Sequence, residues 1–256
     1  MPQNIHPTAY IAENVSLGDH ISIGPFAVLE EHVELGDGCQ IGPHSVIQSY
    51  VKMGSGNVLH PQVVLGGLPQ DTSFKSETVS WLEIGDENVF REGFTAHRSA
   101  SENGITRIGS NCFFMNNSHV AHDCTVGDTS IFANNVAIGG FVDVGDKVFL
   151  GGNVVVHQFC RVGSYVMVRG TTGLSKDVIP FMLIGGWPAK HFKLNSVALR
   201  RSGISGERYK VLSSAFRLLK KRESLDSLPE TEELKILKKW LSEKSKRGLY
   251  GFKELD

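Results

Sequence analysis

Large aliphatic residues recur every six positions through most of the chain. One run continues without a gap from Ile5 to Leu65, and a second continues from Ile108 to Leu174. Neither the 3.6-residue period of an amphipathic helix nor the two-residue period of a half-buried strand fits this spacing. A six-residue period over such a length predicts a solenoid made of short strands.

A second inward position follows four residues after each large one, and it holds mostly small or β-branched residues. Glycine often follows the large residue directly, as at Gly18, Gly36 and Gly127, where we expect a bend that needs a permissive backbone. Each hexad then forms one short strand and a turn. Three hexads close a coil of eighteen residues, and coils stack at the strand spacing of ~4.8 Å. The pattern therefore predicts a mainly β protein, with a parallel β-helix over residues 1–187.

Two segments leave the six-residue pattern, one near 66–80 and the other near 98–106. Both must bulge out of the coil. Insertions in a regular solenoid tend to lie on its binding face, so both are candidate parts of a site.

After Pro180 the hydrophobic period changes to that of amphipathic helices. Leu and Phe at helical spacing predict helices over 205–222 and 229–246, with a shorter one over 194–201. We expect residues 188–256 to form a helical domain that caps the open end of the coil, whose strand edges would otherwise be unpaired.

The net charge of −1 conceals an uneven distribution. Residues 189–256 carry 17 Lys and Arg against 9 Asp and Glu, whereas the rest of the chain carries 9 against 18. A basic tail predicts a docking surface for an anionic partner, although amphipathic surface helices are often rich in Lys and Arg without one. No apolar run approaches the ~18 residues of a membrane span, and residues 1–4 do not resemble an export signal. We expect a cytoplasmic protein without stable membrane insertion.

The register separates core residues from candidate functional ones. All four cysteines occupy the small inward position, which favours buried packing over a metal site or disulfides: Cys39, Cys112, Cys124 and Cys160. None of the ten histidines occupies an inward position. His119, His122 and His157 are therefore candidates for chemistry, whereas scattered surface placement accounts for most of the others.

His122 is the strongest catalytic candidate because Asp123 follows it. A neighbouring carboxylate can fix the imidazole tautomer and stabilise the imidazolium, although adjacent residues in an extended chain often point apart. Gly140 lies eighteen residues later and is stacked on His122 one coil along. A general base beside a backbone N–H is the minimum that acyl transfer requires. No third histidine lies at a spacing that would complete a zinc site with His119 and His122, so no metal is expected.

Several stretches resemble the UDP-N-acetylglucosamine O-acyltransferase family, which starts lipid A synthesis in Gram-negative bacteria. The most specific are Asn117-Ser-His-Val-Ala-His-Asp-Cys-Thr-Val-Gly127 and Val156-His-Gln-Phe-Cys160, and further matches are Pro69-Gln70-Asp71 and Asp177-Val-Ile-Pro180. The resemblance covers nearly the whole chain. It implies a homotrimer of left-handed parallel β-helices with active sites between subunits. It also implies transfer of a 3-hydroxyacyl chain from acyl carrier protein to the 3-hydroxyl of UDP-N-acetylglucosamine, with no cofactor besides the carrier-bound thioester.

The resemblance also implies a role for individual residues. His122 corresponds to the general base, Asp123 to the carboxylate that orients it, and Gly140 to the backbone donor for the oxyanion. The positions that match substrate-binding residues are Gln70, Asp71, His119, His157, Gln158, Asn195 and Arg201. Gly170 matches the position that limits acyl length, where glycine leaves room for a longer chain. Acyl carrier protein is acidic and would suit the basic tail, and no nucleic acid partner is expected.

Four departures from the family pattern bear on substrate choice. Phe141 stands where histidine is usual, and Gly185-Gly-Trp-Pro-Ala-Lys190 replaces a Gly-Asn stretch. Val197 and Ser202 stand where some members carry a charged residue. Two other readings therefore stay open. The first is acylation of another nucleotide sugar, such as a 3-amino sugar, or use of a short acyl-CoA donor. The second is a non-catalytic scaffold, against which the intact His122–Asp123 pair argues.

Overall fold

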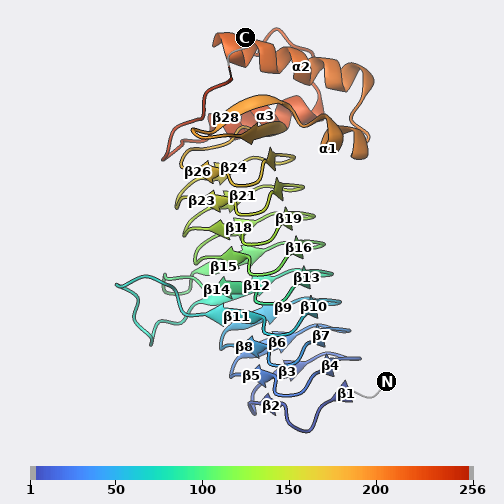
Figure 1. Ribbon diagram of the computed structural model, residues 1–256, viewed down its shortest axis with the longest axis vertical. Helices are drawn as coiled ribbons and strands as arrows, with labels where there is room; N and C mark the ends of the chain where they lie inside the picture. Colours follow the sequence, from blue (N-terminus) through green and yellow to red (C-terminus); the bar gives the residue numbers. More distant parts are fainter. Residues whose placement is uncertain (1–3, 254–256) are drawn as a thin grey trace.

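The computed structural model describes residues 4–253, which form a left-handed parallel β-helix with helices at its C-terminal end (Figure 1). Three sheets run along the coil, and their strands are parallel except for the last strand of one sheet. We call the eleven-stranded one sheet A; in spatial order its strands are β1 (Asn4–Ile5), β4 (Ser22–Ile23), β7 (Gln40–Ile41), β10 (Val58–Leu59), β13 (Val89–Phe90), β16 (Phe113–Phe114), β19 (Ile131–Phe132), β22 (Phe149–Leu150), β25 (Met167–Val168), β27 (Met182–Gly185) and β28 (Lys190–Leu194).

The other two sheets complete the triangular cross-section. Sheet B contains β2 (Tyr10–Ile11), β5 (Val28–Leu29), β8 (Val46–Ile47), β11 (Val64–Gly67), β14 (Thr95–His97), β17 (His119–Val120), β20 (Ala137–Ile138), β23 (Val155–Val156) and β26 (Gly173–Leu174). Sheet C contains β3 (Ser16–Leu17), β6 (Val33–Leu35), β9 (Val51–Met53), β12 (Trp81–Ile84), β15 (Ile105–Ile108), β18 (Thr125–Val126), β21 (Asp143–Val144) and β24 (Arg161–Val162).

The strand register confirms the eighteen-residue coil. Away from the insertions each strand pairs with the strand that lies eighteen residues further on, as His119 does with Ala137 and Thr125 with Asp143. From Ile23 onward, the large residues of the register point inward and are buried. Four phenylalanine rings that pack against one another fill the middle of the coil: Phe90, Phe94, Phe114 and Phe132.

All four cysteines are buried and unpaired, as the register predicted. Burial raises the pKa of the Cys124 thiol to about 12, so it stays protonated and unreactive at neutral pH. These side chains serve as small core residues.

We expected the glycines that follow the large residues to supply a permissive backbone at a bend, and that reason was wrong. Gly18, Gly36 and Gly127 do not have a positive φ angle; the left-handed residue of each turn comes two positions later and is usually not glycine, as at His20. A Cβ atom at Gly127 would lie 2.7 Å from the backbone nitrogen of Asp146 in the next coil. Glycine is required because successive coils approach too closely for a side chain.

Both insertions leave the coil at the same corner, where the chain passes from sheet B to sheet C. The longer one connects β11 to β12 and projects outward beside β14 (Figure 1). The shorter one connects β14 to β15. This edge, which we call the B–C corner, continues upward through the turns at 121–124, 139–142 and 157–160.

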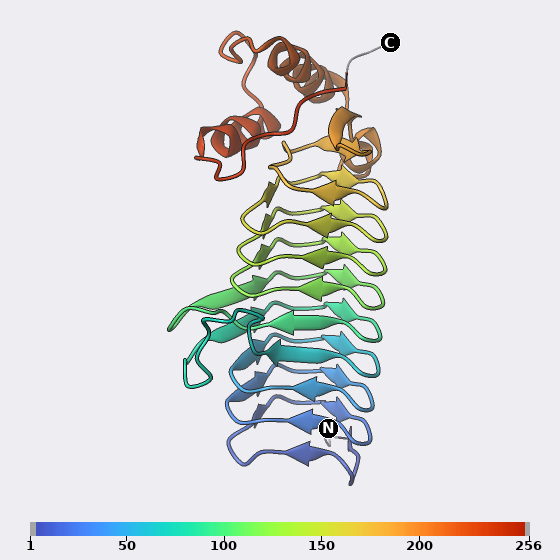
Figure 2. The same ribbon diagram turned by 60° about the vertical axis from the view of Figure 1, so that its left-hand side comes forward.

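The predicted helices are present as α1 (Ser196–Arg201), α2 (Gly206–Lys221) and α3 (Glu232–Ser242). They lie over the C-terminal end of the coil and form a second hydrophobic cluster (Figure 2). The antiparallel hairpin of β27 and β28 extends sheet A. The suggested domain boundary between residues 187 and 188 falls in the turn of this hairpin and remains a proposal. Within residues 4–253, no helix has the length and apolar character needed to cross a membrane.

Candidate active site

His122 and Asp123 form a hydrogen-bonded pair in the turn after β17. His122 Nδ1 lies 2.8 Å from Asp123 Oδ2, and each side chain is 11% exposed. Adjacent side chains meet here because Asp123 occupies the left-handed position of the turn, with φ at 59°. A carboxylate is acceptor-only, so the imidazole is protonated at Nδ1 and its Nε2 is free to accept a proton.

The Asp123 carboxylate is held by groups from the shorter insertion. Ser99 Oγ donates a short hydrogen bond to Oδ1, and the Ala100 N–H donates to Oδ2 at 3.0 Å. The backbone N–H of Asp123 donates to Thr106 Oγ1 at 2.7 Å. Burial alone would raise the pKa of Asp123, but the hydrogen bonds from His122, Ser99 and Ala100 outweigh burial and lower it.

Gly140 lies directly over the His122 ring in the next coil. A Cβ atom at Gly140 would be 2.8 Å from His122 Nε2, so only glycine leaves space at this point. Among the described residues, the Gly140 N–H has no hydrogen-bond acceptor, while its carbonyl accepts from the Phe159 N–H at 3.0 Å. Within residues 4–253, a backbone donor without an acceptor thus stands beside a histidine whose Nε2 makes no hydrogen bond.

His119 lies in β17, directly before the turn that carries the His122–Asp123 pair, which we call the dyad. Its Nδ1 lies 2.7 Å from Thr95 Oγ1, and its ring packs edge-on against His97 at 4.7 Å. Burial lowers the pKa of His119, and it lowers the pKa of His97 to about 4. Both rings are neutral near pH 7, so they can make polar contacts without adding charge.

His157 and Gln158 lie above Gly140 and meet the C-terminal tail. Arg247 donates to His157 Nδ1 at 2.8 Å and to the Gln158 carbonyl at 2.8 Å. Arginine is always a donor, so His157 Nδ1 is the acceptor and any N–H of a neutral ring is on Nε2. Phe159 stacks on Phe141, whose ring lies edge-on to His122 at 5.4 Å. Phe141 therefore forms an apolar wall beside the dyad.

Asp71 is carried to the dyad by the longer insertion. Its Oδ1 accepts from the Ser73 N–H at 2.8 Å and from Ser73 Oγ at 2.7 Å. These hydrogen bonds from Ser73 lower the pKa of Asp71. Gln70 is exposed next to it. Arg98, buried in the shorter insertion, donates to the Thr78 carbonyl at 2.7 Å and so ties the two insertions together.

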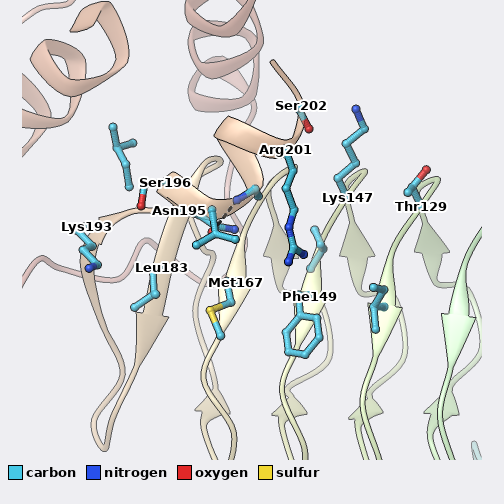
Figure 3. Close-up of a pocket in the computed structure, with 15 residues that line it drawn as sticks. Thr129, Lys147, Phe149, Met167, Leu183, Lys193, Asn195, Ser196, Arg201 and Ser202 are labelled. Atoms are coloured by element: carbon cyan, nitrogen blue, oxygen red, sulfur yellow. Dashed lines mark hydrogen bonds between the residues drawn. The ribbon is translucent and has the colours of Figure 1, made fainter. Parts of the chain in front are cut away.

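Asn195 and Arg201 lie elsewhere, in a cavity of about 650 Å³ between α1 and the outer face of sheet A (Figure 3). Arg201 is exposed and extends from α1 toward Phe149. Lys147 and Lys193 add positive charge, and none of the described residues lining the cavity is acidic. Asn195 is engaged within the fold: Oδ1 caps α1 and Nδ2 donates to the Tyr165 carbonyl at 2.8 Å. The Asn195 side chain therefore has little hydrogen-bonding capacity left for a ligand. Arg201 is the better hydrogen-bond donor to an anion.

Gly170 occupies a third place, the corner between sheets A and B, where a Cβ atom would lie 3.1 Å from the Gly152 carbonyl. One chain therefore brings together eight of the predicted site residues along the B–C corner: Gln70, Asp71, His119, His122, Asp123, Gly140, His157 and Gln158. Asn195, Arg201 and Gly170 are not among them. Within residues 4–253, no three His, Cys, Asp or Glu side chains are grouped to hold a metal ion.

Sequence reasoning missed three residues at this corner, namely Ser99, Thr106 and Arg247. Ser99 and Thr106 contact Asp123, and Arg247 contacts His157. The only signal for Ser99 and Thr106 was that residues 98–106 leave the six-residue pattern.

Comparisons with known proteins agree with this architecture. A family model described as UDP-N-acetylglucosamine O-acyltransferase, domain 2, matches residues 177–250, and one described as bacterial transferase hexapeptide (six repeats) matches residues 32–67 and 105–140. The structure of LpxA from Acinetobacter baumannii superposes with a TM-score of 0.90 at 35% identity, covering 96% of this chain and 99% of that one. The Francisella novicida UDP-N-acetylglucosamine acyltransferase gives a TM-score of 0.89 at 28% identity, covering 96% and 94%.

Two curated relatives carry the name acyl-[acyl-carrier-protein]--UDP-N-acetylglucosamine O-acyltransferase. The Sulfurihydrogenibium sp. (strain YO3AOP1) protein is 51% identical over 255 residues, which is 96% of this chain and 93% of the relative. The Anaeromyxobacter sp. (strain Fw109-5) protein is 41% identical over 160 residues, and that match spans 62% of each chain. The chain belongs to the UDP-N-acetylglucosamine O-acyltransferase family.

Proposed function

We propose that this protein transfers a 3-hydroxyacyl chain from acyl carrier protein to the 3-position of UDP-N-acetylglucosamine, the first step of lipid A biosynthesis. The observation that carries the proposal is the His122–Asp123 dyad. The free Nε2 of His122 lies next to Gly140, whose backbone N–H makes no hydrogen bond within residues 4–253. No cofactor beyond the carrier-bound thioester is needed for this reaction, and a cytoplasmic location is part of the proposal.

The dyad supplies each proton transfer in this mechanism. His122 Nε2 accepts the proton of the sugar 3-hydroxyl while that oxygen attacks the thioester carbonyl carbon. Asp123 holds the ring through Nδ1 and stabilises the imidazolium that forms. The Gly140 N–H donates to the oxyanion of the tetrahedral intermediate. When the carbon–sulfur bond breaks, the imidazolium returns its proton to the departing thiolate, and the ester and free carrier thiol remain.

The remaining residues of the corner would position the acceptor sugar. Asp71, His119, His157 and Gln158 would surround the dyad with polar groups, and the hydrogen bonds from Ser73 lower the pKa of Asp71 further below neutral pH. Phe141 presents an apolar ring where the family pattern has histidine. An acceptor with a 3-amino group, which would give an amide, is therefore the second candidate.

A homotrimer would complete the site. The outward residues of sheet A are apolar and partly exposed in seven successive strands: Val58, Val89, Phe113, Ile131, Phe149, Met167 and Leu183. The outward row of sheet C is charged instead, with Glu34 paired to Lys52 and Glu83 to Arg107. An apolar face suits an interface between copies, and a charged face suits solvent. In such a trimer the Arg201 cavity of one copy could face the dyad of the next, with the basic tail near the acidic carrier.

The test is an acceptor panel with purified protein and 3-hydroxyacyl carrier protein. UDP-N-acetylglucosamine and its 3-amino analogue are supplied separately, and acylated product is measured by mass spectrometry. We expect acylation of the hydroxyl sugar, its loss in His122→Ala, and retention in His44→Ala, which changes an exposed histidine outside the B–C corner. Preference for the amino sugar would replace the acceptor in the proposal, and full activity of His122→Ala would overturn the mechanism. Light scattering should give about three times the 28.0 kDa chain mass.

A further inference from the structure

Ser99 is a buried residue with no role in the mechanism given above. It lies in the shorter insertion, is 0% exposed, and neither its type nor its position in the repeat marks it as a site residue. Its hydroxyl has one proton, which it donates to Asp123 Oδ1. The same oxygen accepts the Ser101 N–H at 3.0 Å. The hydroxyl proton and one of the two oxygen lone pairs are therefore used, and the direction of the hydroxyl proton is fixed.

The bond from Ser99 determines which carboxylate oxygen faces the histidine. Oδ1 is occupied by Ser99, whereas Oδ2 accepts from His122 Nδ1 at 2.8 Å and from the Ala100 N–H at 3.0 Å. Without the hydroxyl, Oδ1 would lose its donor in a side chain that is 11% exposed. The carboxylate could then rotate to regain a partner, at the expense of the bond to His122.

The backbone of Ser99 is itself held on both sides. Its carbonyl accepts from Ser80 Oγ at 2.5 Å, and its N–H donates to the Trp81 carbonyl at 3.3 Å. The preceding residue, Arg98, donates to the Thr78 carbonyl in the longer insertion. The two insertions are thus hydrogen-bonded to each other next to Ser99, and such support restricts the orientation of the side chains that it holds.

We propose that Ser99 is a positioning residue that holds the Asp123 carboxylate in the orientation that His122 needs. This inference rests on the proposed function, since the orientation matters only if His122 is the base. Ser99 acts through Asp123 and does not touch the substrate.

The test compares Ser99→Ala with Ser101→Ala, which removes an exposed hydroxyl from the same turn and keeps the backbone N–H. For Ser99→Ala we expect kcat to fall by about 10- to 150-fold, the range for losing a hydrogen bond to a charged group. The KM values for both substrates should stay within about twofold. Ser101→Ala should match the wild type.

A double-mutant cycle separates positioning from a general structural effect. If Ser99 works only through Asp123, then Ser99→Ala should cost little further activity in an Asp123→Asn background. Additive losses, or an unchanged kcat in Ser99→Ala, would overturn the proposal.

A measurement without turnover distinguishes failure of this inference from failure of the proposed function. NMR of protein labelled with ¹³C at the aspartate carboxyl groups follows the Asp123 titration, with Asp123→Asn identifying the signal. Ser99→Ala should raise the pKa of Asp123 even if no acceptor in the panel is acylated. An unchanged titration would refute the role of Ser99 whatever the enzyme activity.

Discussion

Gly140 offers the most direct test of the catalytic geometry, because one methyl group would fall between the base and the backbone donor. In Gly140→Ala the added Cβ would lie 2.7 Å from His122 Cε1 and 2.8 Å from Nε2. Carbon–carbon contacts are favourable only near 3.5–4.0 Å, so the ring must move. The backbone itself accepts alanine, since Gly140 is not among the residues with positive φ.

The magnitude follows from what the ring must give up. His122 cannot shift far without lengthening its 2.8 Å contact with Asp123. Losing such a charge-assisted bond costs about 1.5–3 kcal/mol, which corresponds to roughly 10- to 150-fold in rate. The methyl group also blocks the approach of a carbonyl to the Gly140 N–H, and loss of one oxyanion donor costs ~10²–10³. We expect kcat to fall by at least about 100-fold.

The matched control is Gly152→Ala, another glycine in a turn of the coil. There the nearest atom to an added Cβ is the Asn134 carbonyl oxygen at 3.6 Å, an ordinary contact. Both variants are assayed for initial rate with the preferred acceptor, and their melting temperatures are compared. If Gly140→Ala stayed within about threefold of Gly152→Ala in kcat, Gly140 could not lie at the reacting carbonyl.

Two further predictions concern acyl length and pH. Gly170→Met should shift the preferred donor to shorter acyl chains, as measured by competition between carrier-bound chains, because a side chain there fills the space left by glycine; an unchanged preference would remove Gly170 from the acyl site. Burial lowers the pKa of His191 to about 4 from an ordinary 6.5, so the folded state disfavours its protonation. Stability should therefore be full above pH 6.5 and decline as the pH falls toward 4, and His191→Gln, which does not titrate, should weaken that decline in melting experiments. An equal decline in both proteins would show that other groups cause it.

The coil could be predicted from sequence because its rule is local and repeated. One large residue every six positions fixes which side chains face inward, and eighteen-residue stacking places Gly140 over His122. The same register assigned the cysteines correctly to the core. These relations need no knowledge of the path of any loop.

Contacts made by non-repetitive segments could not be predicted in this way. Ser99 reaches Asp123 only because an insertion folds back on the next coil, and Arg247 reaches His157 across 90 positions of sequence. Asn195 matched a nucleotide-binding position, yet its side chain caps α1. His122 and Asp123 meet because Asp123 has a left-handed backbone conformation. In an extended chain, adjacent side chains point apart, so the sequence alone did not predict this contact.

The two ends of the coil are unequally protected. The helices cover the C-terminal end, whereas Ile5, Ile11 and Leu17 in the first coil are only partly buried. In a solenoid each coil is stabilised mainly by its immediate neighbours, so opening can proceed one coil at a time from the less buried end. Amide exchange should therefore be fastest in the first described coil and slow progressively along the stack. The coil that carries His122 lies several layers from that end, and its geometry would survive breathing motions that expose the first strands.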